Sequence, residues 1–130
     1  MDSTKADRRI RKTKATLRRT LTHLLKTKEL KDISVSELTE LADVNRGTFY
    51  LHYKDIYNMF EQIENEALEE FTQMITKFKQ QESLVWKSIM LDLFKYISAN
   101  ADLFIAILKT KESAFLTNII EPSIYATVSV

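Results

Sequence analysis

The sequence predicts an all-α fold. Its 130 residues include one glycine and one proline, and apolar residues recur at spacings of three and four along most of the chain. A sheet of tight hairpins needs many more turn-forming residues, whereas helices joined by short polar links do not. Cysteine is absent, which excludes disulfides, thiolate nucleophiles and the usual structural zinc sites.

The chain carries no signal for a membrane or for secretion. It has no long uncharged apolar run that could cross a bilayer, and the segment MDSTKADRRIRKTKATLRR is too charged for a secretory signal. We therefore expect a cytoplasmic protein with no membrane partner.

The first two helices are predicted from apolar spacing and from a cap. The first is expected over residues 7–28, with a buried stripe of Ile10, Leu17, Leu21, Leu24 and Leu25. Ser34, followed three residues later by Glu37, is typical of the capping box that opens a helix. Leu38, Leu41 and Ala42 are the expected buried stripe of this second helix.

A third short helix is expected from Arg46 to Tyr53. Asp43 tolerates turn geometry and Asn45 is a good N-cap. Phe49 and Tyr53 are four residues apart, so they share the face that packs under the second helix.

Four more helices are expected after residue 54. Asp55 caps a long amphipathic helix that ends near Gln80. Ser83 caps a fifth helix that ends near Asn100. A sixth, over residues 101–109, is nearly all apolar and is expected to be buried. A seventh starts at Glu112 and ends before Pro122, since the residue before a proline disfavours helical dihedrals.

Charge divides the chain into two predicted domains, 1–54 and 55–130. The first holds 13 Lys/Arg and 7 Asp/Glu, a net +6, and the second holds 6 and 11, a net −5. A basic head on an acidic body is typical of a nucleic-acid-binding domain joined to a helical regulatory or dimerisation region. A solvated basic helix is the alternative for the charge alone.

The glycine at position 47 lies in the first turn of the third helix. Glycine there costs about 1 kcal/mol relative to alanine, but it removes the side chain that would hold the helix axis away from another surface. Two short helices joined by residues 43–45, after a basic helix, predict a helix-turn-helix whose second member enters the major groove.

Side chains on the outward face suit DNA contact. Thr48 and Tyr50 can donate hydrogen bonds, Leu51 can meet a thymine methyl, and arginine or lysine can bind phosphate or guanine. A packed ring is the alternative for His52, and a core aromatic is the alternative for Tyr50. The predicted DNA-binding residues are Arg9, Arg11, Ser34, Ser36, Asn45, Arg46, Gly47, Thr48, Tyr50, Leu51, His52 and Lys54.

The stretch SVSELTELADVNRGTFYLHY, Ser34 to Tyr53, resembles the DNA-binding domain of tetracycline-repressor-like (TetR family) transcription regulators. The resemblance implies a homodimer that represses transcription from a palindromic operator and releases it when a small molecule enters the carboxy-terminal helices. It places Ser34, Asn45, Arg46, Thr48, Tyr50 and His52 at or near DNA, with Phe49 and Tyr53 in the core.

The chain is shorter than the family pattern. Two further long helices are usual in the family, so a chain ending at Val130 is expected to be a short or truncated form. The sixth helix, with Ile119, Ile120, Ile124 and Tyr125, would then lack its usual cover and need a partner.

The residues expected around a small apolar effector are aromatic and methionine side chains at helical spacing. Ordinary core packing is the alternative for each of them. They are Phe60, Phe71, Met74, Phe78, Trp86, Met90, Phe94 and Phe104.

Two other classes of function compete with the regulator. A helical interaction module that pairs with a full-length relative, with weak or no DNA binding of its own, would also fit a short chain. An enzyme is not expected, because the only histidines are His23 and His52 and no phosphate loop is present. Glu64, Glu66, Glu69 and Glu70 are expected to form a solvated face, so we expect no cofactor and no metal.

Overall fold

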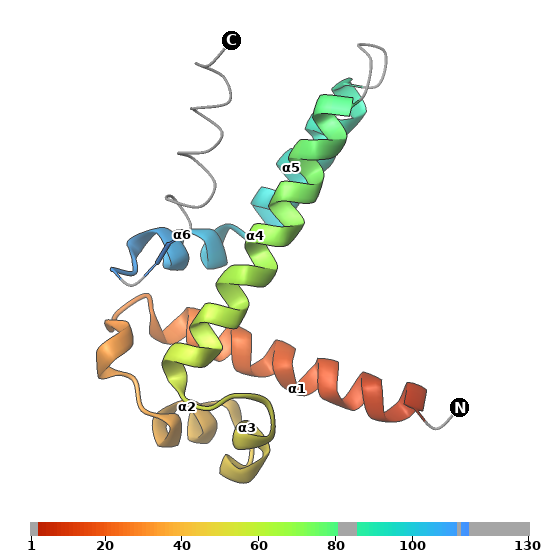
Figure 1. The fold of residues 1–130 in the computed structure, drawn as a ribbon. Helices are drawn as coiled ribbons and strands as arrows, with labels where there is room; N and C mark the ends of the chain where they lie inside the picture. Colours follow the sequence, from red (N-terminus) through yellow and green to blue (C-terminus); the bar gives the residue numbers. More distant parts are fainter. Residues whose placement is uncertain (1–2, 81–85, 112, 115–130) are drawn as a thin grey trace. The chain divides into compact units, whose positions relative to one another are not determined.

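The structure is a computed structural model that describes residues 3–80, 86–111 and 113–114. These residues form α1 (Ser3–Leu24), the 3-10 helix η1 (Leu30–Asp32), α2 (Val35–Ala42), α3 (Arg46–His52), α4 (Ile56–Gln80), α5 (Trp86–Ala99) and α6 (Ala101–Lys109) (Figure 1). No strand occurs in these ranges, which confirms the all-α prediction. None of the described helices combines the length and hydrophobicity that crossing a bilayer requires.

The chain separates into two compact units, Met1–Phe60 and Glu61–Val130. The boundary falls inside α4, after Phe60, whereas the charge pattern had suggested a division after Lys54. The first turn of α4 belongs to the first unit and is buried there through Ile56, Met59 and Phe60.

The first unit is built on the inner stripe of α1, on which α2 packs. Leu17, Leu21, Leu24 and Leu25 are buried as predicted, but Ile10 is exposed and the prediction for it was wrong. The helix starts at Ser3 and ends at Leu24, four residues before the predicted end. Its end is a turn in which the amides of residues 26–28 donate to carbonyls three or four residues behind them.

The link between α1 and α2 contains a 3-10 helix that the sequence analysis did not predict. Leu30 in this helix and Ile33 directly after it are both buried. The link therefore contributes two side chains to the core and fixes the point where α2 begins.

The buried stripe of α2 differs from the predicted one. Leu38 and Ala42 are buried, but Leu41 is 57% exposed, so the prediction for Leu41 was wrong. Thr39 is buried in its place, and its hydroxyl donates to the Val35 carbonyl oxygen at 2.7 Å. This bond satisfies the polar group that burial would otherwise leave without a partner.

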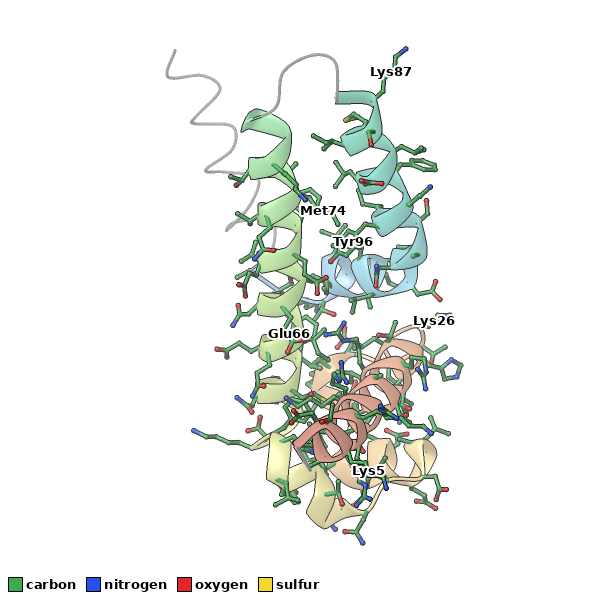
Figure 2. All side chains as sticks on the ribbon, turned by 90° about the vertical axis from the view of Figure 1, so that its right-hand side faces the viewer. Lys5, Lys26, Glu66, Met74, Lys87 and Tyr96 are labelled. Atoms are coloured by element: carbon green, nitrogen blue, oxygen red, sulfur yellow. The ribbon has the colours of Figure 1, made fainter. Side chains whose placement is uncertain are left out.

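In the second unit, the inner face of α5 meets α4. The Tyr96 hydroxyl of α5 donates to a carboxylate oxygen of Glu70 on α4 at 2.6 Å, and Figure 2 shows Tyr96 on the side of α5 that faces α4. The ring of Phe104 on α6 lies 5.7 Å from that of Tyr96 and 6.4 Å from that of Phe71, measured between centroids. These contacts form the aromatic core of the unit.

Two predictions for the second unit were wrong. α6 has the predicted bounds, but Ile105 and Leu108 are exposed while Phe104, Ala106 and Ile107 are buried. One face of this short helix is therefore buried, and the other is apolar and exposed.

Glu64, expected on a solvated face, is also buried. One of its oxygens accepts from the Ala114 amide at 3.1 Å, and the other has no hydrogen-bond partner among the residues that the structure describes. The predictions for Ser83 and for Ile119, Ile120, Ile124 and Tyr125 lie outside the described residues. Most of the seventh helix, predicted to start at Glu112 and end before Pro122, also lies outside them, and the two described residues in that range, Ser113 and Ala114, are not helical.

Candidate nucleic-acid interface

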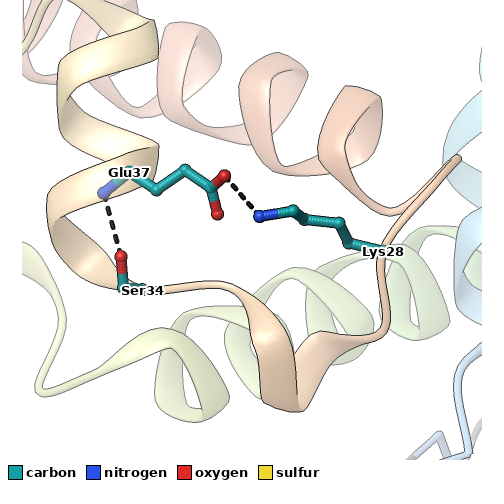
Figure 3. A network of polar contacts seen from close by, with 3 residues as sticks. All are labelled: Lys28, Ser34 and Glu37. Carbon is teal, nitrogen blue, oxygen red and sulfur yellow. Dashed lines mark hydrogen bonds and ion pairs between the residues drawn. The ribbon is translucent and has the colours of Figure 1, made fainter.

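α2 begins at the predicted cap. Ser34 has extended dihedrals, and its Oγ accepts a hydrogen bond from the Glu37 amide at 3.0 Å (Figure 3). The Glu37 carboxylate forms an ion pair with Lys28, which comes from the link after α1. The N-cap prediction is confirmed, and Glu37 joins the start of α2 to that link.

The turn between α2 and α3 is closed by backbone hydrogen bonds at the end of α2. Asp43 adopts the left-handed conformation, with φ 54° and ψ 46°. Its amide donates to the Glu40 carbonyl at 3.2 Å, and the Val44 amide donates to the Thr39 carbonyl at 2.9 Å. This is the Schellman arrangement, which usually has glycine at the left-handed position, and aspartate is among the residues that tolerate it.

α3 presents two different faces. Phe49 is fully buried and Tyr53, which ends the helix, is buried as well, with ring centroids 5.5 Å apart. Tyr50 and Leu51 point outward, and the Leu51 side chain is 80% exposed. The predicted division between an inner and an outer face of this helix is confirmed.

Gly47 lies on the exposed side of the first turn of α3. Its amide donates to Asn45 Oδ1 at 2.7 Å, so the predicted Asn45 cap is confirmed. A Cβ added at Gly47 would lie 3.1 Å from that same oxygen. The absent side chain therefore has two effects. No side chain projects from the outer surface of this turn, and the capping oxygen has room to approach the amide.

All of the predicted DNA-binding residues lie at the surface of the first unit. Thr48 and His52 are half-buried, and the others are exposed. The exposed ones are Arg9, Arg11, Ser34, Ser36, Asn45, Arg46, Gly47, Tyr50, Leu51 and Lys54.

His52, Tyr53 and Lys14 form a cluster that the sequence analysis missed in part. Lys14 Nζ lies 5.8 Å from the centroid of the Tyr53 ring, and the His52 ring lies edge-on to that ring at 6.3 Å. Burial, and next the nearby charge of Lys14, lower the pKa of His52 below its ordinary value of 6.5. The lowered pKa favours the neutral form of the half-buried ring, which fits the packed alternative for this residue as well as a DNA contact.

The sequence did hold a signal for Lys14. It is three residues before Leu17 and seven before Leu21, so it shares the stripe that α1 turns toward the core. A lysine there must bury its stem and bring its charge out at the edge, which places the ammonium group beside Tyr53.

The junction from α3 to α4 is fixed by two side chains. The Asn58 amide donates to Asp55 Oδ1 at 2.7 Å, and Asn58 Oδ1 accepts from the Lys54 amide at 3.0 Å. The predicted cap at Asp55 is confirmed, and the backbone at Lys54 is held next to the end of α3.

Comparison with family models, curated proteins and solved structures found no match. The geometry of the first unit is therefore the basis for assigning a function.

The predicted effector-pocket residues are distributed over both units. Phe60 is in the core of the first unit, and Phe71 and Phe104 meet in the second. Met90 and Phe94 are exposed on α5. The side chains of Phe78 and Trp86 lie outside the described residues.

Met74 lies on the wall of a hollow of about 500 Å³ in the second unit. The described part of this wall comes from α4 alone, and the surface that it presents is mostly apolar although most of its residues are polar in type. Its residues are Glu70, Thr72, Gln73, Met74, Thr76 and Lys77. The described side chains thus bring Phe71 and Phe104 together, and they do not gather the other predicted residues around them.

Proposed function

We propose that α2 and α3 form a helix-turn-helix and that the chain is a sequence-specific, DNA-binding transcription regulator. The observation that carries this proposal is the two-faced α3. Phe49 and Tyr53 anchor it from below, while Tyr50, Leu51 and the bare Gly47 form an exposed outer surface. A short helix anchored in this way can enter the major groove by its first turns.

Donors around α3 and α2 fit contacts to phosphate and to base edges. Ser34 Oγ accepts the cap bond, which leaves its hydroxyl hydrogen available to a phosphate oxygen. Asn45 Oδ1 also accepts a cap bond, which leaves its amide NH₂ available. Arg46 and Tyr50 are the candidates for base edges, and Leu51 for a thymine methyl.

The basic side chains of α1 and Lys54 support a contact with the DNA backbone. Arg9 and Arg11 are exposed, and the Lys54 backbone is fixed by Asn58. Phosphate contacts of this kind orient a protein on the duplex and supply most of its salt-dependent affinity.

A dimer on a palindromic operator completes the proposal. One α3 contacts one half-site, and two half-sites are needed for affinity above the non-specific range. We propose that the protein acts as a repressor, and that a small apolar effector bound in the second unit releases it by favouring a different state of the dimer. The proposal needs no catalytic centre.

Substitutions at Tyr50 test the proposed recognition face. Tyr50→Phe keeps the ring, which packs edge-on to Phe49 at 5.4 Å, and removes only the hydroxyl. Tyr50→Ala removes both. An operator is first selected from a random DNA library with the wild-type chain, and binding is then measured by fluorescence anisotropy.

We expect Tyr50→Ala to lose about 1 to 3 kcal/mol of discrimination between the operator and random DNA, with unchanged helix content by circular dichroism. Tyr50→Phe separates the contribution of the hydroxyl from that of the ring. Equal discrimination by all three proteins would show that Tyr50 reads no base.

A helical interaction module is the second candidate function. The exposed apolar side chains of α5 favour it, because surfaces of this kind bind other proteins. An anisotropy titration separates the two candidates. Binding that weakens steeply with salt and prefers one palindrome supports the regulator, and no DNA binding at low salt supports the module.

A further inference from the structure

α1 carries a row of cations along one face. We call Lys5, Arg8, Lys12 and Arg19 the α1 row. All four are exposed, and no carboxylate of the described residues forms an ion pair with any of them. Arg19 donates one hydrogen bond, to the Thr16 hydroxyl at 3.4 Å, which leaves its other donors for a partner. The intervals of three, four and seven residues keep the row on one side of the helix over about 21 Å, at about 1.5 Å per residue.

The row lies opposite the packed side of α1. Leu17 and Leu21 are fully buried and mark the side on which α2 packs. At about 100° per residue, the row is centred close to 180° around the helix from these two leucines. Arg9 and Arg11, which are the α1 residues in the proposed function, lie on the two flanks between the row and the packed side.

The core of the first unit lies between the row and the outer surface of α3. Phe49 anchors α3 in that core, and Leu51 points outward from it. Figure 1 shows α3 below α1 within this unit. A straight duplex that lies against Leu51 therefore cannot also lie along the row, so the row is a separate surface.

The stability of α1 does not explain the row. Lys5 with Arg8, and Arg8 with Lys12, are like-charge pairs three and four residues apart, and such pairs destabilise a helix. Residues 4–12 are all exposed, so no packing compensates for this repulsion. Alternating charges would stabilise the same segment, and a partner with negative charge accounts for the cations that are present.

We infer that the α1 row is a second, sequence-independent site for duplex DNA, which holds a neighbouring segment while α3 contacts the operator. Each strand of a duplex presents one phosphate per 3.4 Å of axis, so a straight row of this length lies beside about six phosphates of one strand. Lysine and arginine bind phosphate without reading the bases.

The composition of α1 disfavours other anionic partners. The helix has no phenylalanine, tyrosine or tryptophan that could stack on the bases of a single strand or anchor a protein interface. No large apolar side chain lies on the face of the row to enter a bilayer. The choice of DNA over another double-stranded polyanion rests in part on the proposed function.

Capture of a second duplex tests the row. The full wild-type chain is bound to an immobilised selected operator, and a labelled random-sequence duplex is then added at low salt. We expect wild type to retain the labelled duplex. The row variant should retain at least about tenfold less of it while it still binds the operator, because it lacks the phosphate contacts of the row. This variant combines Lys5→Gln, Arg8→Gln, Lys12→Gln and Arg19→Gln.

A control removes the same charge from the second unit. It combines four substitutions at exposed positions, Lys77→Gln, Lys95→Gln, Lys109→Gln and Lys111→Gln. Circular dichroism checks that both variants keep the helix content of wild type, and we expect the two to bind the operator equally. The inference is overturned if wild type captures no second duplex, if the row variant captures as much as wild type, or if the control loses as much as the row variant.

Other polyanions are tested in the same way. A labelled RNA duplex and vesicles that contain anionic lipid each replace the labelled DNA. Retention of either one through the row, with no retention of duplex DNA, would also overturn the inference.

The two proposals fail separately. A protein that binds a selected operator but captures no second duplex removes the row and leaves the proposed function. If no operator can be selected, binding of the random duplex by wild type and by Gly47→Leu, with its loss in the row variant, removes the proposed function and leaves the row as a DNA site.

Discussion

At the scale of single residues, Asn45 and Gly47 depend on one another. The capping oxygen of Asn45 approaches the turn at the place where a Cβ on residue 47 would lie, 3.1 Å from it. Any larger residue at 47 must therefore displace the cap a little while it gains the helix propensity that glycine lacks. The two effects are each about 1 kcal/mol and opposite in sign, so the fold alone gives little reason for a glycine.

Gly47→Leu separates the two roles of this glycine. We expect the free energy of unfolding in urea to change by no more than about 1 kcal/mol, because the two effects above offset each other. We expect specific DNA binding to be lost, because the new side chain holds α3 away from the groove. A normal footprint on the selected operator by Gly47→Leu would show that no close approach takes place at this position.

His52 makes stability depend on pH. Its folded-state pKa is lowered, first by burial and next by Lys14, so the unfolded chain takes up the proton at higher pH than the folded one. The stability that this residue contributes is therefore complete above pH 6.5 and is lost as the pH falls through the folded-state pKa.

Lys14→Met keeps the length of the side chain and removes its charge. We expect it to raise the pKa of His52 toward the ordinary value, measured by NMR titration of the ring. Lys12→Met, on the exposed side of α1, is the control and should leave the titration unchanged. Equal titration curves for wild type and Lys14→Met would mean that burial alone lowers this pKa.

At the scale of the helices, local signals predicted where elements begin. Ser34, Asn45 and Asp55 each make the cap bond that the residue type suggests. Such bonds join residues two or three apart, so they depend little on the rest of the molecule.

The direction that a short helix faces was less predictable. In α2 the set that packs is Val35, Leu38, Thr39 and Ala42, with intervals of three and four. This set was hard to predict because it includes Thr39, and a threonine is not expected in a core. Its burial is possible because its hydroxyl donates to the Val35 carbonyl. Exposure of Leu41 follows from the same rotation of the helix.

The caps of α2 and α3 can be tested by chemical denaturation. We expect Ser34→Ala and Asn45→Ala each to lower the free energy of unfolding by about 1 kcal/mol, because each leaves an amide of the first turn without its partner. Ser36→Ala is the control, because Ser36 is exposed inside α2 and caps nothing. A loss from Ser36→Ala as large as from Ser34→Ala would show that the measurement is not reporting the cap.

At the scale of the whole molecule, the uneven charge of the chain is the feature that the sequence made plain. The first 54 residues carry a net +6 and the rest a net −5. The core of the second unit was harder to predict, since Glu64 is buried and Phe94 is exposed against their residue types. Both depend on contacts between residues far apart in the chain, which periodicity does not encode.

Removing charge from α1 tests whether that surface contacts phosphate. We expect Arg9→Gln with Arg11→Gln to reduce the slope of log affinity against log salt by at most about 1.8, roughly uniformly across DNA sequences. Lys109→Gln with Lys111→Gln is the matched control, with the same change in charge in the second unit. An equal effect of the two pairs would point to net charge rather than contact.

The length of α3 has a consequence for local unfolding in the first unit. A helix of seven residues is too short to persist in water by itself, so it exists only while its underside remains buried through Phe49. Because the helix is so short, fraying of either end would also disturb the packing of Phe49. The amides that are hydrogen-bonded to carbonyl groups of α3 and its cap, from Phe49 to Tyr53, should therefore exchange with solvent only when the surrounding core opens, and this part of the surface is as stable as the interior beneath it.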